Sequence, residues 1–355
     1  MNNDRIQEIL DLMEEARLDY FLISDPQSIA YCTGYYNDPH ERMFVFMISK
    51  HGNHTLFMND LFYLDHDLDV NIAWHKDGQD AIQTIVDEMH FPGRIGIDKN
   101  WASHFLLDLM KKLPDAKYIN ASPCVDLVRM KKDLQEQVLM IESSKINDAV
   151  MEEIIPFIQE GVTEKQLAKK LDELFFNHHS TCYGAIVAFG KNAADPHHEN
   201  DDTLLRKGDC VLIDMGCVYK GYCSDMTRTF FYEGILEEEI KVYEIVKKAN
   251  EAAEAMIKPG VKLSDIDKCA RKVISDEGYG KYFTHRLGHF IGRDVHEYGD
   301  VSSVNEMEVE EGMIFSIEPG IYLEGNFGVR VEDLVMVTKD GCQVLNSFTK
   351  DIYII

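Results

Sequence analysis

Apolar and polar positions in the first third of the chain alternate between a helical and a strand period. An amphipathic segment opens the chain, and the short apolar runs YFLIS, MFVFMIS, HTLFMN and RIGID follow it. Turn-forming residues bound each run, as is typical of strands separated by loops and helices. The pattern predicts a small α/β domain over residues 1–127.

The pattern changes in VRMKKDLQEQVLMIESSKINDAVMEEIIPFIQ, which has helical spacing. Val138, Ile141 and Ile154 fall on one side of this predicted helix, so we expect them to form its apolar face. The change places a domain boundary near residue 127 and predicts a second domain over residues 128–355.

The second domain contains a weak internal repeat. FIQEGVTEKQLAKKLDELF (residues 157–175) aligns with MIKPGVKLSDIDKCARKVI (residues 256–274), and each segment ends one helix, turns at Gly-Val and starts another. Thr163 with Gln166, and Ser264 with Asp267, have the spacing of capping boxes. Strands follow in each half, so the repeat predicts two similar halves. Chance similarity of two helix-turn-helix segments stays open as the alternative.

A predicted hairpin in the first half, VLIDMGCVYKGYCSDMTRTFFY (residues 211–232), carries two acidic residues on a face that should be buried. A fold about Tyr219-Lys220 sets Asp214 opposite Asp225, about 4.5 to 5.5 Å apart between Cβ atoms. Like charges at such positions destabilise a sheet. Their presence therefore calls for something that neutralises them.

A second hairpin is expected in the other half, over residues 313–338. A fold about Gly325 sets Glu318 opposite Glu332. Carboxylates from two strand pairs that converge in a core would supply the hard oxygen ligands of two divalent cations. The repeat thus predicts one pair of facing carboxylates from each half.

A histidine-rich segment, THRLGHFIGRDVHE, lies between the two hairpins. It contains His285, His289 and His296, and Gly288 and Gly292 allow the backbone to bend closely around whatever these side chains face. A single histidine is more often a core residue than a ligand, but histidines and carboxylates in this order favour a metal site.

Composition and charge exclude several classes of partner. The chain has 36 Lys and Arg against 62 Asp and Glu, a formal net charge of -26, which repels phosphate backbones and anionic membrane surfaces. We expect neither nucleic acid nor a membrane as a partner. No stretch reaches the roughly 18 apolar residues of a membrane span, and no signal peptide opens the chain. The eight cysteines form no C-x-x-C pair, so we expect buried thiols in a cytoplasmic protein.

The motifs LIDMGCVYKGYCSDMTRTF, HRLGHFIGRDVHE, SIEPGIY and VRVED together resemble the metallopeptidases of the pita-bread fold. That group contains prolidase, aminopeptidase P, methionine aminopeptidase and the non-metal enzyme creatinase. LDYFLISDPQSIAYCTGYY is similar to the creatinase-type N-terminal domain, and VRMKKDLQEQ resembles the segment that joins the two domains. The resemblance implies an α+β fold, in which a pseudo-twofold pita-bread catalytic domain follows a smaller creatinase-like α/β domain.

The resemblance also implies a site for two divalent metal ions. Asp225 and Glu332 would bridge them, a bridging water would be the nucleophile, and Glu318 would take its proton. Ligation by oxygen with a single histidine suits manganese better than zinc, with cobalt as the alternative. The implied ligands are Asp214, Asp225, His289, Glu318 and Glu332.

Further side chains match positions on the substrate side of the family's site. His285 and His296 match the histidines that hold the scissile amide and stabilise the tetrahedral intermediate, and His197 matches another substrate-side histidine. His198 reads as a surface residue beside it. Arg330, two residues before Glu332, is expected to orient carboxylates rather than to touch the substrate.

Within the family, the sequence favours a prolidase, which hydrolyses Xaa-Pro dipeptides. The N-terminal domain speaks against methionine aminopeptidase, and the complete ligand set speaks against creatinase. An aminopeptidase acting on Xaa-Pro or Met-Xaa N-termini of longer peptides stays open as the alternative. A non-catalytic binding module would be expected to have lost ligand residues, and none is lost here.

Two arginines are candidates for the free carboxylate that a dipeptidase must recognise, because the arginine fork pairs a carboxylate bidentately. Arg286 and Arg293 flank the histidine ligand and depart from the common family pattern. The alternative for either is a solvent-facing side chain or a pair with Asp294.

The segment NDPHERMF, with Asp38, His40, Glu41 and Arg42, resembles a segment of bacterial prolidases. Because the N-terminal domain helps to form dimers in this fold family, we expect a homodimer in which this loop, with His40, approaches the partner's active-site mouth. The alternative is a charged turn between strands.

Overall fold

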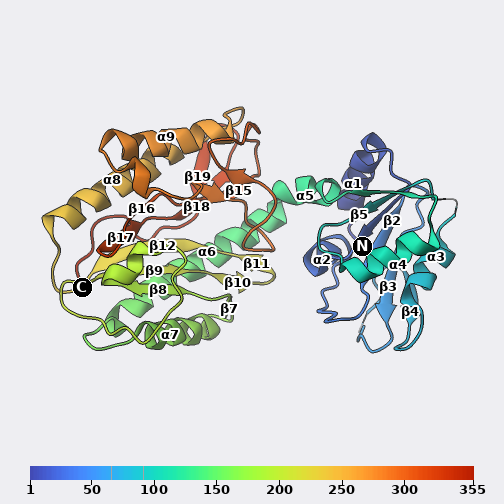
Figure 1. Cartoon of the computed structure of the whole chain (residues 1–355), viewed down its shortest axis with the longest axis horizontal. Coiled ribbons are helices and arrows are strands. Elements are labelled where there is room, and N and C mark those ends of the chain that lie inside the picture. The colour runs from blue at the N-terminus through green and yellow to red at the C-terminus, as the bar shows by residue number, and fades with distance from the viewer. Residues whose placement is uncertain (65, 91) are drawn as a thin grey trace. The chain divides into compact units, whose positions relative to one another are not determined.

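The computed structural model describes residues 1–64, 66–90 and 92–355, and the chain divides into two units, Met1–Arg129 and Met130–Ile355. Each unit has its own core and its own sheets (Figure 1). Within the described residues, no helix is both long and apolar enough to cross a membrane.

The first unit is a six-stranded mixed sheet, in the order β4-β3-β2-β1-β5-β6. The apolar runs of the sequence become β1, β2, β3 and β5, as predicted. The sequence reading missed β4 and β6, which are the partly exposed edge strands and therefore have no continuous apolar run. The elements are α1 (Asn3–Glu15), β1 (Tyr20–Ile23), α2 (Pro26–Thr33), β2 (Val45–Ser49), β3 (Thr55–Asn59), β4 (Asn71–His75), α3 (Ala81–Glu88), β5 (Arg94–Ile97), α4 (Ser103–Lys112), β6 (Lys117–Asn120) and α5 (Pro123–Met130).

Helices cover both faces of this sheet. On one face, Phe21 and Phe46 pack with residues of α1, α2 and α5, and on the other face Leu22 and Val45 pack with residues of α3 and α4. Successive side chains of a strand point to opposite faces. Burial on both sides explains why the central strands read as continuous apolar runs rather than as an alternation.

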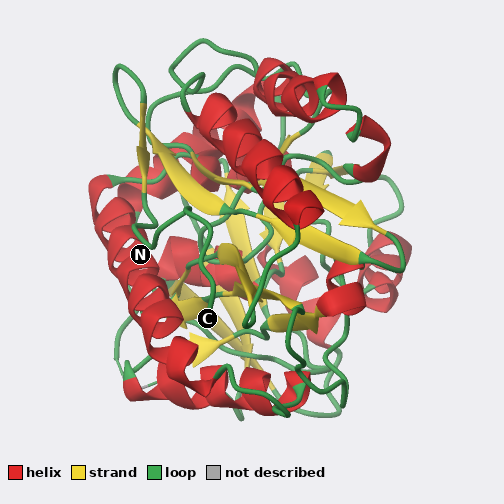
Figure 2. Cartoon of the chain, turned by 90° about the vertical axis from the view of Figure 1, so that its left-hand side faces the viewer, coloured by secondary structure: helices red, strands yellow, loops and turns green. Residues whose placement is uncertain are grey.

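The second unit places its strands between pairs of helices (Figures 1 and 2). Its sheets are small, and the three-stranded ones have the orders β11-β10-β7, β12-β9-β8 and β15-β18-β19. The elements are α6 (Leu134–Ile154), η1 (Ile155–Phe157), α7 (Glu164–Asn177), β7 (Thr181–Cys182), β8 (Ile186–Phe189), η2 (Gly190–Ala194), β9 (Cys210–Met215), β10 (Cys217–Tyr219), β11 (Tyr222–Cys223), β12 (Met226–Phe231), α8 (Glu237–Glu254), α9 (Leu263–Asp276), η3 (Gly280–Tyr282), β13 (Gly288–His289), β14 (Asp300–Val301), β15 (Ile314–Ile317), β16 (Gly320–Leu323), β17 (Phe327–Arg330), β18 (Asp333–Val337) and β19 (Cys342–Val344).

The buried face of α6 differs from the predicted one. Val138 is 54% exposed, whereas Ile154 is buried. The side of α6 that faces the strands instead includes Ser143, Asn147 and Asp148, which bind the backbone or side chains of later segments. Ile141 is partly buried against a core cluster, so the prediction failed at Val138 and missed the polar side chains, which are buried because they have internal partners.

The internal repeat appears as two helix pairs, α6 with α7 and α8 with α9. Gly161 and Gly260 both have positive φ, at 83° and 86°, in the turns between the helices. The capping box of Thr163 and Gln166 is present. The one predicted for Ser264 is wrong, because Lys262 is the N-cap of α9 and the Ser264 hydroxyl donates instead to Glu306.

The hairpin at residues 313–338 has the predicted register. Gly320 pairs with Arg330 and Ile317 pairs with Asp333, so the strands fold about Gly325, whose φ is 75°. Glu318 lies between Ile317 and Gly320 on one side of the hairpin, and Glu332 lies between Arg330 and Asp333 on the other.

The register predicted for residues 211–232 is wrong by two positions. Asp214 pairs with Thr227 rather than with Asp225. The turn is formed by Lys220 and Gly221, with φ of 49° and 82°, which are the two positive values of a tight hairpin turn. A shift of two residues keeps each side chain on its face of the sheet, so both aspartates still point to the same side.

Candidate metal centre

The acidic and histidine side chains expected to act as ligands lie around a pocket of about 760 Å³ in the second unit. Strand ends and the breaks between strands supply most of them, because the backbone leaves the ladder there and side chains can converge, whereas Asp214 lies within a paired strand. Asp214 is in β9, Asp225 precedes β12, His289 ends β13, Glu318 follows β15, and Glu332 follows β17.

The spacing of the donor atoms fits a cation. Nε2 of His289 lies 3.6 Å from Oδ2 of Asp225 and 3.6 Å from Oε1 of Glu318. Two ligands at about 2.0 to 2.2 Å from one ion are separated by roughly 3 to 3.6 Å. Single donor atoms of Asp225, His289 and Glu332 all lie within 4.8 Å of one another.

One oxygen of this cluster has no partner in the protein. Oδ1 of Asp225 is buried and makes no hydrogen bond within the described residues. A buried carboxylate oxygen without a partner costs free energy, and a bound cation would remove that cost. The residues present therefore fit divalent metal ions.

The electrostatics of the pocket agree with this interpretation. Burial raises the pKa of Asp225 well above its ordinary value, and the charges of Asp214 and Glu318 raise it further. Burial, followed by the charge of Asp225, raises the pKa of Glu332 in the same way. Burial raises the pKa of Glu318 to about 7, against the opposing charge of Arg330. Without a cation, burial and repulsion between the carboxylates favour the neutral, protonated form of these groups.

Arg330 ties several parts of the site together. Its Nη2 lies 2.6 Å from Oδ2 of Asp214, and its Nε donates to Oγ1 of Thr227 at 3.0 Å. Thr227 in turn donates to Oε2 of Glu332 at 2.6 Å. Arg330 is 2% exposed, so these bonds are shielded from water and hold two of the acidic side chains in place.

The ring of His285 is fully engaged within the protein. Nη1 of Arg330 donates to the Tyr322 hydroxyl at 3.0 Å, and that hydroxyl lies 2.8 Å from Nε2 of His285. Nδ1 lies 2.7 Å from the carbonyl of Arg286 and must donate to it, because a carbonyl has no proton to give. Burial lowers the pKa of His285 to about 4, so the ring is neutral near pH 7 and its Nε2 accepts the proton of the Tyr322 hydroxyl.

The other expected substrate-side residues are placed differently from one another. His197, His296 and Arg286 are exposed and line the pocket. The ring of His296 lies edge-on to that of His289, with centroids 4.3 Å apart. Arg293 is instead 5.4 Å from the ring centroid of Tyr222 and is not part of the pocket lining.

His198 is not the surface residue that the sequence predicted. Its side chain is 12% exposed and lies 2.7 Å from the buried carboxylate of Glu164. Glu164 also accepts hydrogen bonds from the backbone of Phe189 and Asp201 and from the side chain of Asn192. Glu164, His198 and Asp201 are close enough to hold an ion, but the carboxylate is already satisfied, so we interpret the cluster as an anchor for the segment that carries His197.

A buried ion pair anchors the segment that carries His296. Nζ of Lys132 lies 2.9 Å from Oε2 of Glu297, with side chains 1% and 5% exposed. Oε1 of Glu297 accepts from the backbone of Arg293 at 2.9 Å. Gly292 allows this approach, because a Cβ there would lie 2.7 Å from the Glu297 carboxylate.

The sequence reading missed several residues in and around the pocket. Tyr322 does not line the pocket but contacts His285 and Arg330. It lies within the SIEPGIY motif, and strand alternation from Glu318 could have placed it near the site. Tyr183 gave no such signal, since it approaches the pocket only through the fold, over Gly216. The pocket residues without a predicted role are Tyr183, Gly184, Ile186, Pro196 and Val295.

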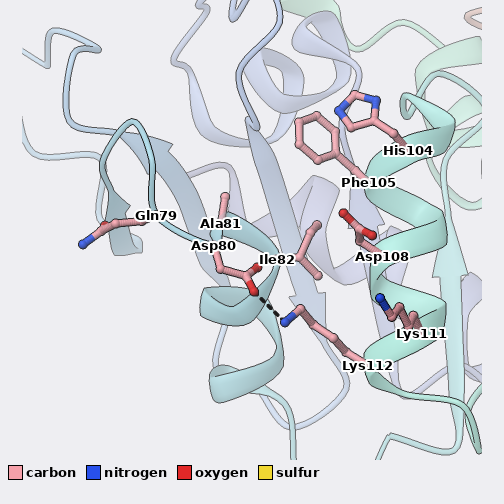
Figure 3. Close-up of a pocket in the computed structure, with 9 residues that line it drawn as sticks. All are labelled: Gln79, Asp80, Ala81, Ile82, His104, Phe105, Asp108, Lys111 and Lys112. Carbon is pink, nitrogen blue, oxygen red and sulfur yellow. Dashed lines mark hydrogen bonds and ion pairs between the residues drawn. The ribbon is translucent and has the colours of Figure 1, made fainter.

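The first unit has a pocket of its own, of about 510 Å³, between α3 and α4 (Figure 3). Lys112 reaches Asp80 across it at 2.6 Å. None of the residues expected to act in the site lines this pocket. His40 lies elsewhere in the first unit, with a side chain 74% exposed and 3.8 Å from Asp38, and Arg42 pairs with Asp77 at 2.9 Å.

Both units of the chain match known protein families. The model of metallopeptidase family M24 matches residues 138–339, and that of the creatinase/prolidase N-terminal domain matches residues 5–131. An uncharacterized peptidase of Staphylococcus aureus is 34% identical and covers 98% of this chain and 99% of its own length. A dipeptidase structure from Pyrococcus horikoshii has a TM-score of 0.92 and 35% identity over 99% of this chain and 100% of that chain. A Xaa-Pro dipeptidase structure from Bacillus anthracis has a TM-score of 0.92 and 28% identity over 99% of each chain. These matches confirm the predicted fold class, a creatinase-type domain followed by a pita-bread domain.

Proposed function

The chain belongs to metallopeptidase family M24, and from that premise we propose that it is a manganese-dependent Xaa-Pro dipeptidase. The observation that carries the proposal is the pocket itself, in which four carboxylates converge with the imidazole of His289, and a buried oxygen of Asp225 has no partner among the described residues. The similarity to solved structures titled as dipeptidases supports the choice of substrate class.

In this proposal Asp214, Asp225, His289, Glu318 and Glu332 would hold two divalent cations. Such a pair would supply an activated water as nucleophile and would polarise the scissile carbonyl. A site with one imidazole among carboxylates favours manganese over zinc.

The remaining roles belong to side chains of the pocket. Glu318 lines the pocket beside the other carboxylates, so we assign it the role of proton acceptor. His296 and His197 are exposed toward the pocket, so we assign them contact with the scissile amide. His285 has both ring nitrogens engaged within the protein, so we assign it the positioning of Tyr322 in place of the substrate contact expected from the sequence.

We assign the carboxylate of the dipeptide to Arg286. It is exposed and lines the pocket, whereas Arg293 packs by Tyr222. Arg286→Ala should raise KM for Leu-Pro by roughly tenfold or more, since a lost charged hydrogen bond costs about 1.5 to 3 kcal/mol. Arg293→Ala is the matched control and should leave KM near the wild-type value. Equal effects of the two variants would contradict the assignment.

The direct test compares proline release from Leu-Pro with cleavage of Leu-Pro-Gly by chelated protein, with and without added manganese. We expect rapid turnover of the dipeptide that depends on manganese, and slow turnover of the tripeptide. Preferred cleavage of the tripeptide would make the protein an aminopeptidase. Activity on neither would contradict a peptidase of this class.

We also propose that the protein is a homodimer whose 38–42 loop influences substrate entry. The exposure of His40, and of Tyr36 and Tyr63 at 55% and 79%, supports a surface that meets another chain. A dimer mass by light scattering, and a changed KM for His40→Ala, are expected. A monomer, or wild-type kinetics in a His40→Ala, Arg42→Ala double variant, would favour the simple charged turn.

A further inference from the structure

One amide side chain connects the two strands that carry Glu318 and Glu332. Asn250 lies in α8, which packs along β15, β16 and β17, and is 0% exposed. Its Nδ2 donates to the carbonyl of Ile317 at 2.9 Å and lies 3.4 Å from the carbonyl of Val331. These two carbonyls belong to the residues immediately before Glu318 and Glu332. Asn250 therefore holds both backbone segments at the points from which the two acidic side chains project.

A lysine fixes the orientation of that amide. Nζ of Lys350 donates to Oδ1 of Asn250 at 2.7 Å, which directs Nδ2 toward the two carbonyls. Lys350 is held in turn by both oxygens of Glu254 at 2.7 Å and by Asp333 at 2.8 Å. Glu254 is on the same helix as Asn250, and Asp333 directly follows Glu332. The ammonium therefore ties α8 to the strand at the site.

An arginine holds the same strand from the other side. Nη1 of Arg228 donates to the carbonyl of Glu332 at 2.6 Å, and Nη2 lies 2.7 Å from Oδ1 of Asp333. The side chains of this pair are 1% and 0% exposed. The backbone on both sides of Glu332 is thus fixed by buried groups, whereas the backbone before Glu318 is tied to it through Asn250.

The first half of the repeat has a simpler version of this arrangement. Asn147 of α6 donates to the carbonyl of Met215 at 3.0 Å, next to Asp214. Its Oδ1 is buried and has no hydrogen-bond partner within the described part of the chain. Within the described residues no lysine donates to the Asn147 oxygen, so an amide oriented by a lysine is found in the second half of the repeat and not in the first.

We propose that Asn250 and Lys350 are positioning residues that set the separation of the Glu318 and Glu332 carboxylates, and thereby the affinity of the pocket for divalent cations. The inference rests on the proposed metal site. Metal ligands must be held within about 0.5 Å of their working positions, and the two carbonyls that Asn250 binds are each joined to a ligand residue by one peptide bond.

The test uses the full chain after chelation. Asn250→Asp keeps the size of the side chain and its contact with Lys350 but removes both donated hydrogen bonds, and Lys350→Met removes the ammonium. Each should weaken Mn²⁺ binding, measured by calorimetry, by about 10- to 100-fold. The electron paramagnetic resonance spectrum of the bound manganese should also change, because the relative placement of the carboxylates changes.

The matched control is Lys247→Met, in the same helix, which removes an ion pair with Asp351 near the surface and should bind Mn²⁺ as the wild type does. A lower melting temperature with unchanged Mn²⁺ affinity and spectrum in the two test variants would make the network merely structural and overturn the proposal. If Asn250→Asp does not fold, Lys350→Met decides alone. A wild-type protein that binds no Mn²⁺ would instead contradict the proposed function.

Discussion

At the scale of single residues, the pocket depends on carboxyl groups whose charges the protein balances only in part. Arg330 pairs with Asp214 at 2.6 Å, whereas Asp225 and Glu332 have raised pKa values, first of all because they are buried. Their residue types and positions could be predicted, because each lies in a motif of the sequence. The roles of Tyr322 and Asn250 could not, since a hydrogen-bond partner distant in sequence leaves no local pattern.

The raised pKa of Glu318 predicts a specific dependence on pH in the metal-free protein. The folded-state pKa is about 7 against an ordinary value of 4.5, so the folded protein binds more protons than the unfolded chain between these values. Stability therefore falls as the pH rises through this window. Glu318→Gln should raise the melting temperature of chelated protein by several degrees at neutral pH and have little effect near the low end of the window.

His285 and His289 change the stability of the protein with pH in the opposite direction. Burial lowers their pKa values to about 4 and about 3, so their contribution is lost as the pH falls below 6.5 in wild type and variant alike. The difference between the two melting curves reports Glu318 together with Asp225 and Glu332, whose pKa values its charge raises. A constant difference from about pH 5 to pH 8 would contradict the account.

At the scale of elements, turn chemistry decided how well the hairpins could be predicted. The turn at Gly325 contains a glycine with φ of 75° and gave the right register. The other turn places Lys220 at φ of 49°, and a lysine in that conformation gives no turn signal. The error was two residues, so the face of each aspartate was still predicted correctly.

The loop between β13 and β14 depends on the buried pair of Lys132 and Glu297. Lys132→Met removes the ammonium that faces Glu297 at 2.9 Å in a shielded position. Breaking a buried pair on one side costs about 3 to 5 kcal/mol. We expect a clear loss of stability in chemical denaturation and a raised KM, because His296 lies on this loop.

The double variant Lys132→Met, Glu297→Gln should recover part of that stability, since it removes the buried charge as well. Lys131→Met is the control, because Lys131 pairs with Glu310 where both side chains are about half exposed, and such pairs contribute about 0 to 1 kcal/mol. Equal losses in the Lys131 and Lys132 variants would contradict this reading.

At the scale of the whole molecule, the chain is two units, and the proposed ligands all belong to the second one. The resemblance of the motifs to M24 peptidases is confirmed by the family match. The N-terminal unit could be predicted as an α/β domain because its central strands are buried on both faces, but its exposed edge strands were missed.

Metal binding should therefore stabilise one unit selectively. A ligand that binds only the folded state stabilises the part that binds it. Adding Mn²⁺ to chelated protein should slow hydrogen exchange in peptides from residues 210–232 and 313–338, with no change in peptides from residues 20–59. Equal protection across both units would contradict a site built from the second unit alone.

The central claim is that two divalent cations held by the pocket drive dipeptide hydrolysis. The most direct measurement follows proline release from Leu-Pro while chelated protein is titrated with Mn²⁺, in the wild type and in Glu332→Gln. The account predicts no activity without metal, a rise that saturates at two equivalents per chain, and little activity in the variant. Full activity in the chelated protein, or wild-type activity in Glu332→Gln, would contradict it.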